Sequence, residues 1–388
     1  MSSDSTREIV DSVRAAVEGV TQRWGREYYL HKARTGEAPT EMYAAMAEQG
    51  LFALGVAEEH GGSGGGLVAT AAVMEAMSEA GTPPMLFSLT SFARQAILHS
   101  GTPQQIADHV VPSLTAERTF SFAMTEPDAG TNSFAMRTRA ERQEDGSFRV
   151  NGHKVFISGA DQGDHMLLVA RTTPLDQVAR KSDGISVFVL PRDTAGVTMS
   201  RMAIDWKAPE KQFAVWFDDV ILPPESLIGQ EGRGLAAMFT SLNAERVVIS
   251  AWTLGLGQRA IDKGVAYARV RGPWGVPIGS YQAVAHPLAK AAAQLVAARL
   301  TIYEAARTFD AGGSAGDLAN VAKYLASEAA YAAIDAALQV HGGSGFDEDS
   351  DIITLWPMIR LLRIAPLNNE MVLNYVSEHM LGLPRSYE

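Results

Sequence analysis

The amino-acid sequence predicts an α+β protein of several domains, in which a short β-rich segment separates two helical parts. Residues 5–118 have the pattern of helices broken by glycine and proline. Residues 150–220 alternate in hydrophobicity between turn signals, which is typical of antiparallel sheet. Beyond residue 234 the chain is rich in alanine and apolar on several helical faces, as in helix bundles. We therefore expect an α-helical N-terminal domain (1–118), a central antiparallel β-barrel-like domain (119–232) and a C-terminal four-helix bundle (233–388).

Helices are expected where apolar residues recur at helical spacing. The first runs from Thr6 to Trp24, and further helices are expected at 68–80, 92–99, 235–270, 281–311 and 318–340. Strands are expected at 166–172, 185–190 and 213–220. The dipeptides Asp145-Gly146 and Asn151-Gly152 predict tight turns, and the second is expected to join residues 148–150 to 153–157 as a two-residue hairpin.

The composition excludes several classes of function. A net charge of −11 argues against nucleic acid or an acidic membrane surface as the main partner. The chain has no cysteine, which excludes disulfides, thiolate catalysis and thiolate metal sites, and its histidines lack metal-binding spacing, so no metal site is expected. No apolar run approaches the roughly 20 residues of a membrane span, and the N-terminal residues show no signal-peptide pattern. A cytoplasmic protein is expected.

Two motifs carry the first functional signal. They are FAMTEPDAGTN at 122–132 and RVNGHKVFISG at 149–159, and each ends a predicted strand in small or hydroxylated residues. This pattern leaves backbone N–H groups and the Thr125 and Ser158 hydroxyls directed at one place, with Phe156 as an aromatic face. A planar ligand with a polar edge, such as a flavin, binds to a wall of this kind.

Two later segments add signals that are ambiguous alone. In Tyr267–Ala289, Arg271 can bind a phosphate through two hydrogen bonds and Trp274 offers a stacking face, but a capped helical hairpin has the same pattern. In Gln339–Phe346, paired glycines after a helix allow a dinucleotide to approach closely, but they also fit an ordinary helix end.

The order helical, β, helical, with these four motifs in sequence, resembles the acyl-CoA dehydrogenase family along nearly the whole chain. The resemblance implies FAD as cofactor, dehydrogenation of an acyl-CoA thioester between its α and β carbons, and an electron-transfer flavoprotein as electron acceptor. It implies cofactor contacts by Phe122, Met124, Thr125, Thr131, Phe156, Ser158, Arg271, Trp274, Gln282, Gln339, Gly343, Asn368 and Glu370. It implies substrate contacts by Thr131, Asn132, Asn243 and Arg246, with Arg94 as a further candidate that points either into the acyl pocket or to the surface.

The family places its catalytic base in one of two positions. The commoner position, a glutamate near the C-terminus, corresponds here to Pro366 in RIAPLNNEM, and proline cannot accept a proton. The other position, used by the isovaleryl- and long-chain-type enzymes, corresponds to Glu245 in LNAERVVISA. Glu245 is therefore the candidate base, although a glutamate beside Arg246 also fits a solvated or salt-bridged pair.

Pro366 also removes a backbone N–H that the family uses to bind the thioester oxygen. Either the Leu367 N–H takes this place, or a ribityl hydroxyl of the flavin acts alone, or the chain carries out different chemistry. The alternatives to dehydrogenation are desulfination or oxidation of an acyl-CoA on the same scaffold, and an FAD-binding subunit of a hetero-oligomeric dehydrogenase. A homotetramer, a dimer of dimers, is the assembly that the resemblance implies.

Overall fold

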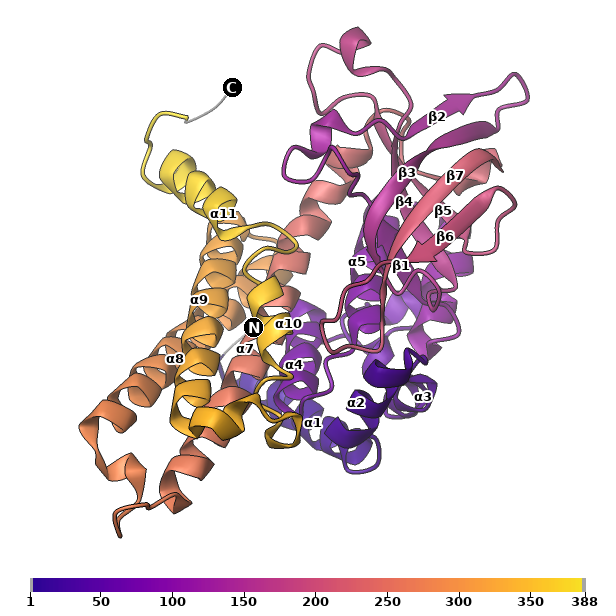
Figure 1. Ribbon diagram of the computed structural model, residues 1–388. Coiled ribbons are helices and arrows are strands. Elements are labelled where there is room, and N and C mark those ends of the chain that lie inside the picture. Colours follow the sequence, from indigo (N-terminus) through magenta and orange to yellow (C-terminus); the bar gives the residue numbers. More distant parts are fainter. Residues whose placement is uncertain (1–2, 386–388) are drawn as a thin grey trace. The chain divides into compact units, whose positions relative to one another are not determined.

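The computed structural model describes residues 3–385, apart from the side chains of residues 3, 236, 237, 239 and 240, and shows helices at both ends of the chain with a sheet between them (Figure 1). The N-terminal helices are α1 (Ser3–Thr21), α2 (Arg26–Thr35), α3 (Thr40–Glu48), α4 (Gly66–Glu79), α5 (Met85–Ser100) and the short α6 (Pro103–Gln105). The expected helices at 6–24, 68–80 and 92–99 correspond to α1, α4 and α5. The fold class predicted from the sequence is confirmed.

Within residues 3–385, eight strands form one sheet in the order β6-β7-β3-β2-β4-β5-β8, and β1 pairs with β4 beside this path. The strands are β1 (Phe120–Ala123), β2 (Arg139–Arg142), β3 (Phe148–Ser158), β4 (His165–Arg171), β5 (Ile185–Pro191), β6 (Val197–Arg201), β7 (Gln212–Leu222) and β8 (Leu227–Ile228). Most pairs are antiparallel, but β4 runs parallel to both β1 and β2, so the sheet is mixed. The long connections that precede β4 allow these parallel pairs, which a tight hairpin cannot make.

The hairpin expected at Asn151-Gly152 is wrong. Both residues lie inside β3, which continues unbroken from Phe148 to Ser158 and pairs along its length with β7. The register shifts between Val150 and Gly152, so the glycine marks an irregularity in a strand. The turn is made by Asp145-Gly146, where Gly146 has a φ of 86° between β2 and β3.

Strand β4 is buried on both faces and divides the apolar interior of the sheet region. Leu167 and Val169 pack into one cluster together with Ile97 and other α5 side chains. Leu168 and Ala170 point the other way, into a cluster with β3 and β7. This explains why the sequence of β4 is continuously apolar, since no face is exposed to solvent.

A buried ion pair connects the end of β1 to β3. The Lys154 ammonium, which has no solvent exposure, donates to the Met124 carbonyl (2.8 Å) and to Glu126 Oε1 (2.9 Å). The Glu126 carboxylate also accepts from the backbone N–H groups of Arg137 (2.6 Å) and Thr138 (2.9 Å). Burial lowers the pKa of Lys154 to about 8, against the opposing effect of Glu126. Because every group in this network has a partner, the loop after β1 is held at both ends.

The C-terminal helices are α7 (Gly234–Val270), α8 (Gln282–Asp310), α9 (Gly316–His341), α10 (Trp356–Leu361) and α11 (Asn369–Tyr375), the last continuing as a π-helical turn, Val376–Met380. The helices α8 and α9 lie side by side (Figure 1). Helix α7 approaches them closely at Gly257, where a Cβ atom would lie 2.8 Å from Leu295 and 2.9 Å from Ala330. Glycine at this position therefore sets the spacing between α7 and its neighbours.

The chain forms two compact units. One comprises Met1–His31, Gly65–Pro84 and Asn243–Glu388, and the other Lys32–Gly64 and Met85–Leu242. The sheet, α3 and α5 belong to the second unit, whereas α1, α4 and the long C-terminal helices after residue 242 belong to the first.

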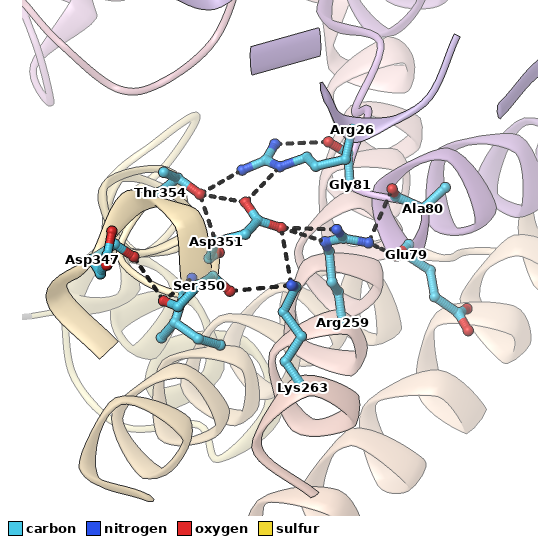
Figure 2. Close-up of polar contacts among 11 residues, drawn as sticks. Arg26, Glu79, Ala80, Gly81, Arg259, Lys263, Asp347, Ser350, Asp351 and Thr354 are labelled. Carbon is cyan, nitrogen blue, oxygen red and sulfur yellow. Dashed lines mark hydrogen bonds and ion pairs between the residues drawn. The ribbon is translucent and has the colours of Figure 1, made fainter. Parts of the chain in front are cut away.

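The first unit is organised around the buried Asp351 carboxylate (Figure 2). Arg26 Nε donates to Asp351 Oδ1 (2.8 Å), and Arg259 Nη2 donates to Oδ2 (2.8 Å). The same arginines donate to the carbonyls at the end of α4, Arg26 to Gly81 (2.7 Å) and Arg259 to Ala80 (3.1 Å). Carbonyls at a helix C-terminus carry partial negative charge, so they stabilise both guanidinium groups. One carboxylate thus connects α2, α4 and α7 with the segment after α9.

Among residues 3–385, none of the helices combines the length and the apolar character needed to span a bilayer.

Replacing Asp351 by asparagine (Asp351→Asn) should lower the free energy of unfolding by about 3 kcal/mol at pH 7, because two buried guanidinium groups lose their counter-charge. Burial by itself raises the pKa of Asp351, but the positive charges of Arg26 and Arg259 outweigh this effect and hold the pKa below its ordinary value. The stabilisation is therefore complete above the carboxyl's unfolded pKa, about 4, and is lost as the pH falls through the folded pKa. Thermal and urea unfolding at several pH values measure this free energy. The exposed neighbour serves as control: Asp349→Asn should change little, and equal losses in both variants would contradict the assignment.

Lys154→Met should also destabilise the protein by about 3 kcal/mol, because it leaves the Glu126 carboxylate buried without its cation. The double variant Glu126→Gln/Lys154→Met should lose less than the sum of the two single variants, since the charges are removed together. Urea unfolding of all three proteins provides the measurement, with Lys290→Met, at an exposed position of α8, as the control. Strictly additive losses would show that the two side chains do not interact.

Candidate functional site

The two sequence motifs meet at one end of the sheet. Phe122 lies in β1, and Met124 and Thr125 follow the strand directly. The Thr125 carbonyl accepts a hydrogen bond from the Val155 N–H (2.9 Å), which ties the first motif to the second on β3. The side chains of Phe122, Met124 and Thr125 are each partly exposed. The structure therefore joins the backbones of the two motifs, and the ligand-binding wall expected from the sequence stays a prediction.

Phe156 is held in an unusual conformation at this wall. Its φ is 59°, in the left-handed region, and it lies where the register of β3 shifts against β7. Its side chain is 55% exposed. A bulky residue with positive φ is a genuine outlier, and such strain is concentrated at functional sites. The bulge thus turns a large aromatic side chain outward, where it can contact a ligand.

The end of β3 and the residue after it are held by hydrogen bonds to Lys211 and Gln212. The Gly159 N–H donates to the Lys211 carbonyl (2.8 Å), and Gln212 Nε2 donates to Ser158 Oγ (2.8 Å). Glu210 is fully buried and receives a short hydrogen bond from the Tyr43 hydroxyl, while its Oε2 has no partner in the described chain. Burial raises the pKa of Glu210 to about 7. Gly159 has a φ of 59°, and a Cβ there would lie 3.1 Å from Leu86, so glycine is favoured at this position.

Thr131 and Asn132, the candidates for contact with the substrate, are exposed in the loop after the first motif. This loop contains an antiparallel bridge between Glu126 and Ala129, so its start is ordered by the buried Glu126. Both residues therefore lie in the loop that the Lys154–Glu126 pair holds.

Glu245 lies in α7, within the first unit. Its side chain is half-buried, and its carboxylate forms no hydrogen bond or ion pair with the groups that the structure describes. Burial raises the pKa of Glu245 to about 7, and the charge of Arg246 opposes this rise. Arg246 itself donates to Asn243 Oδ1 (2.8 Å). The salt-bridged alternative for Glu245 therefore does not describe this structure, because Arg246 bonds to Asn243.

The loop that carries Pro366 is held by Lys323 of α9. The Lys323 ammonium, 1% exposed, donates to Asn369 Oδ1 (2.5 Å) and to the Arg363 carbonyl (3.3 Å). Burial lowers the pKa of Lys323 to about 8. The Leu367 N–H, which directly follows the proline, forms no hydrogen bond within the described chain. It is therefore a backbone donor free to bind a ligand.

Two further candidates follow Pro366. Asn368 accepts from the Met371 N–H (2.8 Å) and so caps α11, and Glu370 is exposed in the first turn of that helix.

The connection from α7 to α8 is open to solvent. Arg271 is exposed and its guanidinium forms no hydrogen bond or ion pair in the described part of the chain. Trp274 is 76% exposed, and its ring meets Tyr281 edge to face at 6.2 Å between centroids. Gln282, at the start of α8, is exposed as well. This segment offers a cation and a stacking surface to a molecule outside the chain.

The glycine pair after α9 is equally open. Gln339 is exposed, and a Cβ on Gly342 or Gly343 would meet nothing within 4 Å. His341 is buried and stacks on Tyr267 with 4.3 Å between ring centroids. The backbone at Gly342–Gly343 therefore has free space above it, as a site for a phosphate or adenylate group requires.

Arg94 does not reach the surface. Its side chain is 2% exposed, so the surface alternative from the sequence is wrong. Helix α5 turns this side towards the interior of the second unit, where Arg94 donates to the Phe52 carbonyl and to Ser91 Oγ (2.9 Å).

Sequence reasoning missed several residues that hold the site. Glu126 and Lys154 lie inside the two motifs. A lysine at a buried position of a predicted strand could have indicated that Lys154 needs a buried acidic partner. Lys323 lies among the buried residues Ala319, Ala322 and Ala326, and a charge in such an apolar stripe was also detectable. For Glu210 no pattern in the sequence signals its burial.

Family models cover most of the chain. The acyl-CoA dehydrogenase N-terminal, middle and C-terminal domain models match residues 3–117, 121–215 and 232–381. The chain is 38% identical over 380 residues to the acyl-CoA dehydrogenase FadE12 of Mycobacterium tuberculosis, covering 97% of each chain. It is 30% identical over 336 residues to subunit CarC of the caffeyl-CoA reductase-Etf complex of Acetobacterium woodii, covering 85% and 86%. The butyryl-CoA dehydrogenase of Megasphaera elsdenii has a similar structure, with a TM-score of 0.90, 25% identity and 98% and 99% coverage.

The residues present fit the FAD of this family. The bulged Phe156 offers an aromatic face, the exposed and unpaired Arg271 offers a cation for phosphate, and the glycine pair at 342–343 leaves open space above its backbone. With the family models and the relatives, they show that this chain belongs to the acyl-CoA dehydrogenase family and acts on acyl-CoA with FAD as its cofactor.

Proposed function

We propose that Glu245 is the base that removes the α-proton of the acyl-CoA. The single observation that supports this most directly is a half-buried carboxylate that has no partner among the described residues and whose pKa burial raises to about 7. A general base is most effective when its pKa lies near the working pH. Pro366 occupies the other position that the family uses and has no acidic group.

The neighbours of Glu245 have distinct roles in this proposal. Arg246 is drawn towards Asn243, which leaves the Glu245 carboxylate free to accept a proton while the nearby positive charge limits the rise of its pKa. The thioester oxygen gains negative charge as the α-proton leaves and needs a hydrogen-bond donor. We assign the free Leu367 N–H to this task, because Pro366 has no N–H to donate.

The bound FAD supplies the acceptor for the hydride that leaves the β-carbon. We propose that this chain holds it through the residues expected from the sequence. These are Phe122, Met124, Thr125, Thr131, Phe156, Ser158, Arg271, Trp274, Gln282, Gln339, Gly343, Asn368 and Glu370. Asn132, with Thr131, would contact the CoA part of the substrate.

We also propose an electron-transfer flavoprotein as the electron acceptor and a homotetramer as the assembly. The first is supported by CarC, a relative whose name places it in a complex with Etf. The second is supported by the outer face of α8, where Val296 is 54% and Leu300 68% exposed. It is also supported by Arg271, which forms no hydrogen bond or ion pair within the described residues, and by the exposed Trp274, since both suit a cofactor held by a neighbouring copy. Light scattering of the purified protein tests the assembly, which should have the mass of four chains. The domain limits 1–118, 119–232 and 233–388 remain our proposal.

Glu245→Gln should keep its bound FAD, and so its yellow colour, but lose at least about 10³-fold in kcat, because the amide cannot accept the proton. In the unchanged protein, kcat/KM should rise with pH through about 7 and then level off, since only the deprotonated carboxylate acts as base. Steady-state assays with acyl-CoA and an artificial electron acceptor under anaerobic conditions measure both.

Glu304→Gln, at an exposed position of α8, is the matched control and should change neither quantity. If Glu245→Gln retained its activity, Glu245 could not be the base. An unchanged protein that binds FAD but dehydrogenates no acyl-CoA thioester would favour the alternatives, desulfination or oxidation, or a subunit that needs a partner to supply the base.

A further inference from the structure

Arg94 is a buried cation without a counter-charge. Its guanidinium is 2% exposed, and no carboxylate lies within ion-pair distance of it in residues 3–385. It donates only to neutral groups, the Phe52 carbonyl and Ser91 Oγ (2.9 Å), and its Nε has no partner. Burial alone lowers its pKa, to about 10, so the group is still charged at neutral pH.

A purely structural role fits Arg94 poorly. Arg171, the other deeply buried arginine of this unit, donates to four backbone carbonyls. Burial lowers the pKa of Arg171, but the nearby charge of Glu126 opposes this effect, although the Arg171 Nε, like that of Arg94, has no partner in the described chain. Arg26 has Asp351 as a direct partner. Arg94 has neither a carboxylate nor a full set of carbonyls. A buried charge without compensation is destabilising, so its presence indicates that a bound molecule supplies the missing anion.

The polar groups around Arg94 form a small stripe on α5. Ser88, Ser91 and Arg94 follow one another at three-residue spacing, and all three are buried. The Ser88 hydroxyl forms no hydrogen bond within the described residues, although its side chain is only 5% exposed. Two buried donors on one helix, Ser88 Oγ and Arg94 Nε, are therefore left for a ligand.

Helix α5 is attached to the strand that carries the cofactor wall (Figure 1). The Phe120 N–H at the start of β1 donates to Thr90 Oγ1 (3.1 Å), and the Phe92 ring meets the Phe122 ring at 4.8 Å between centroids. Phe122 belongs to the proposed flavin wall. An acyl chain that has its reacting carbons at this wall therefore lies beside α5, the helix that carries Arg94.

We infer that Arg94 binds a carboxylate at the far end of the acyl chain, so that the substrate is the CoA thioester of a dicarboxylic acid. This inference rests on the proposed function and names its substrate class. The guanidinium would form charge-assisted hydrogen bonds to the carboxylate, with Ser88 as a further donor. A neutral alkyl end would leave the cation buried and unpaired, as in the free protein.

The first test uses the unchanged holoenzyme and pairs of substrates of equal chain length. These are succinyl- and butyryl-CoA, adipyl- and hexanoyl-CoA, and suberyl- and octanoyl-CoA, assayed with an artificial electron acceptor. For at least one length, kcat/KM for the carboxylated chain should exceed that for the neutral chain by about 10-fold or more. A preference for the neutral chain at every length would overturn the inference and leave the proposed function intact. Failure of all six to reduce the flavin would overturn both.

The second test measures, in each variant, the ratio of kcat/KM for the carboxylated chain to kcat/KM for the neutral chain of the same length. Arg94→Met should lower the ratio of kcat/KM for the carboxylated over the neutral chain by about 10²-fold, and Arg94→Lys, which keeps the charge, should lower it less. Arg149→Met, at an exposed position of β3, is the control and should leave the ratio unchanged. If Arg94→Met does not fold, Arg94→Lys and the first test still decide. An unchanged ratio in a folded Arg94→Met protein would refute the inference.

Discussion

Burial of ionised side chains away from water is the constraint on which this structure depends. A charge removed from water destabilises the fold by several kcal/mol unless protein groups replace its hydration shell. Lys154 meets this demand with the Met124 carbonyl and the Glu126 carboxylate, and Asp351 meets it with two arginines. Because these groups must be surrounded, the loops and helix ends that surround them have little freedom. The first motif and the segment after α9 are each held in this way.

The charges that lack partners show where a ligand belongs. Glu245 has no hydrogen bond in the described chain, and Arg94 has only neutral acceptors and one unpaired nitrogen. The exposed Arg271 likewise has no carboxylate beside it. In a fold that satisfies Lys154 and Asp351 so completely, these exceptions mark groups kept available for proton transfer or for binding. In our proposals their different roles follow from their sign and surroundings: Glu245, a carboxylate with raised pKa, accepts a proton, and Arg94, a buried guanidinium, binds an anion.

Pro366 changes the chemistry of the loop in which it lies. It removes both the acidic side chain and the backbone N–H from this position, so the base and the oxyanion donor must come from elsewhere. Lys323 contacts the loop at Asn369 and Arg363. The amide that follows the proline, that of Leu367, has no hydrogen-bond partner within the described residues. In our proposal the base lies instead in α7, at Glu245. The oxyanion donor is the N–H of Leu367, one residue after Pro366.

The sequence by itself determined the class of the fold, the family and the motifs. These rest on local signals, such as the helical spacing of apolar residues, the continuous apolar run of β4 and the short motifs around Thr125 and Ser158. It also singled out Glu245, because Pro366 left the common position without an acid. It misjudged Asn151-Gly152, where pairing with β7 keeps β3 extended although the dipeptide favours a turn.

Only the tertiary structure decided which charges are paired. Glu126 and Lys154 are 28 residues apart in the chain, and Arg26 and Asp351 are 325 apart, so no local pattern reveals that they meet. The same holds for Arg94, whose burial depends on how α5 packs against Phe52 and β1, and for the bulge that turns Phe156 outward. Desolvation depends on every atom that surrounds a group in space, and the linear sequence does not contain that information.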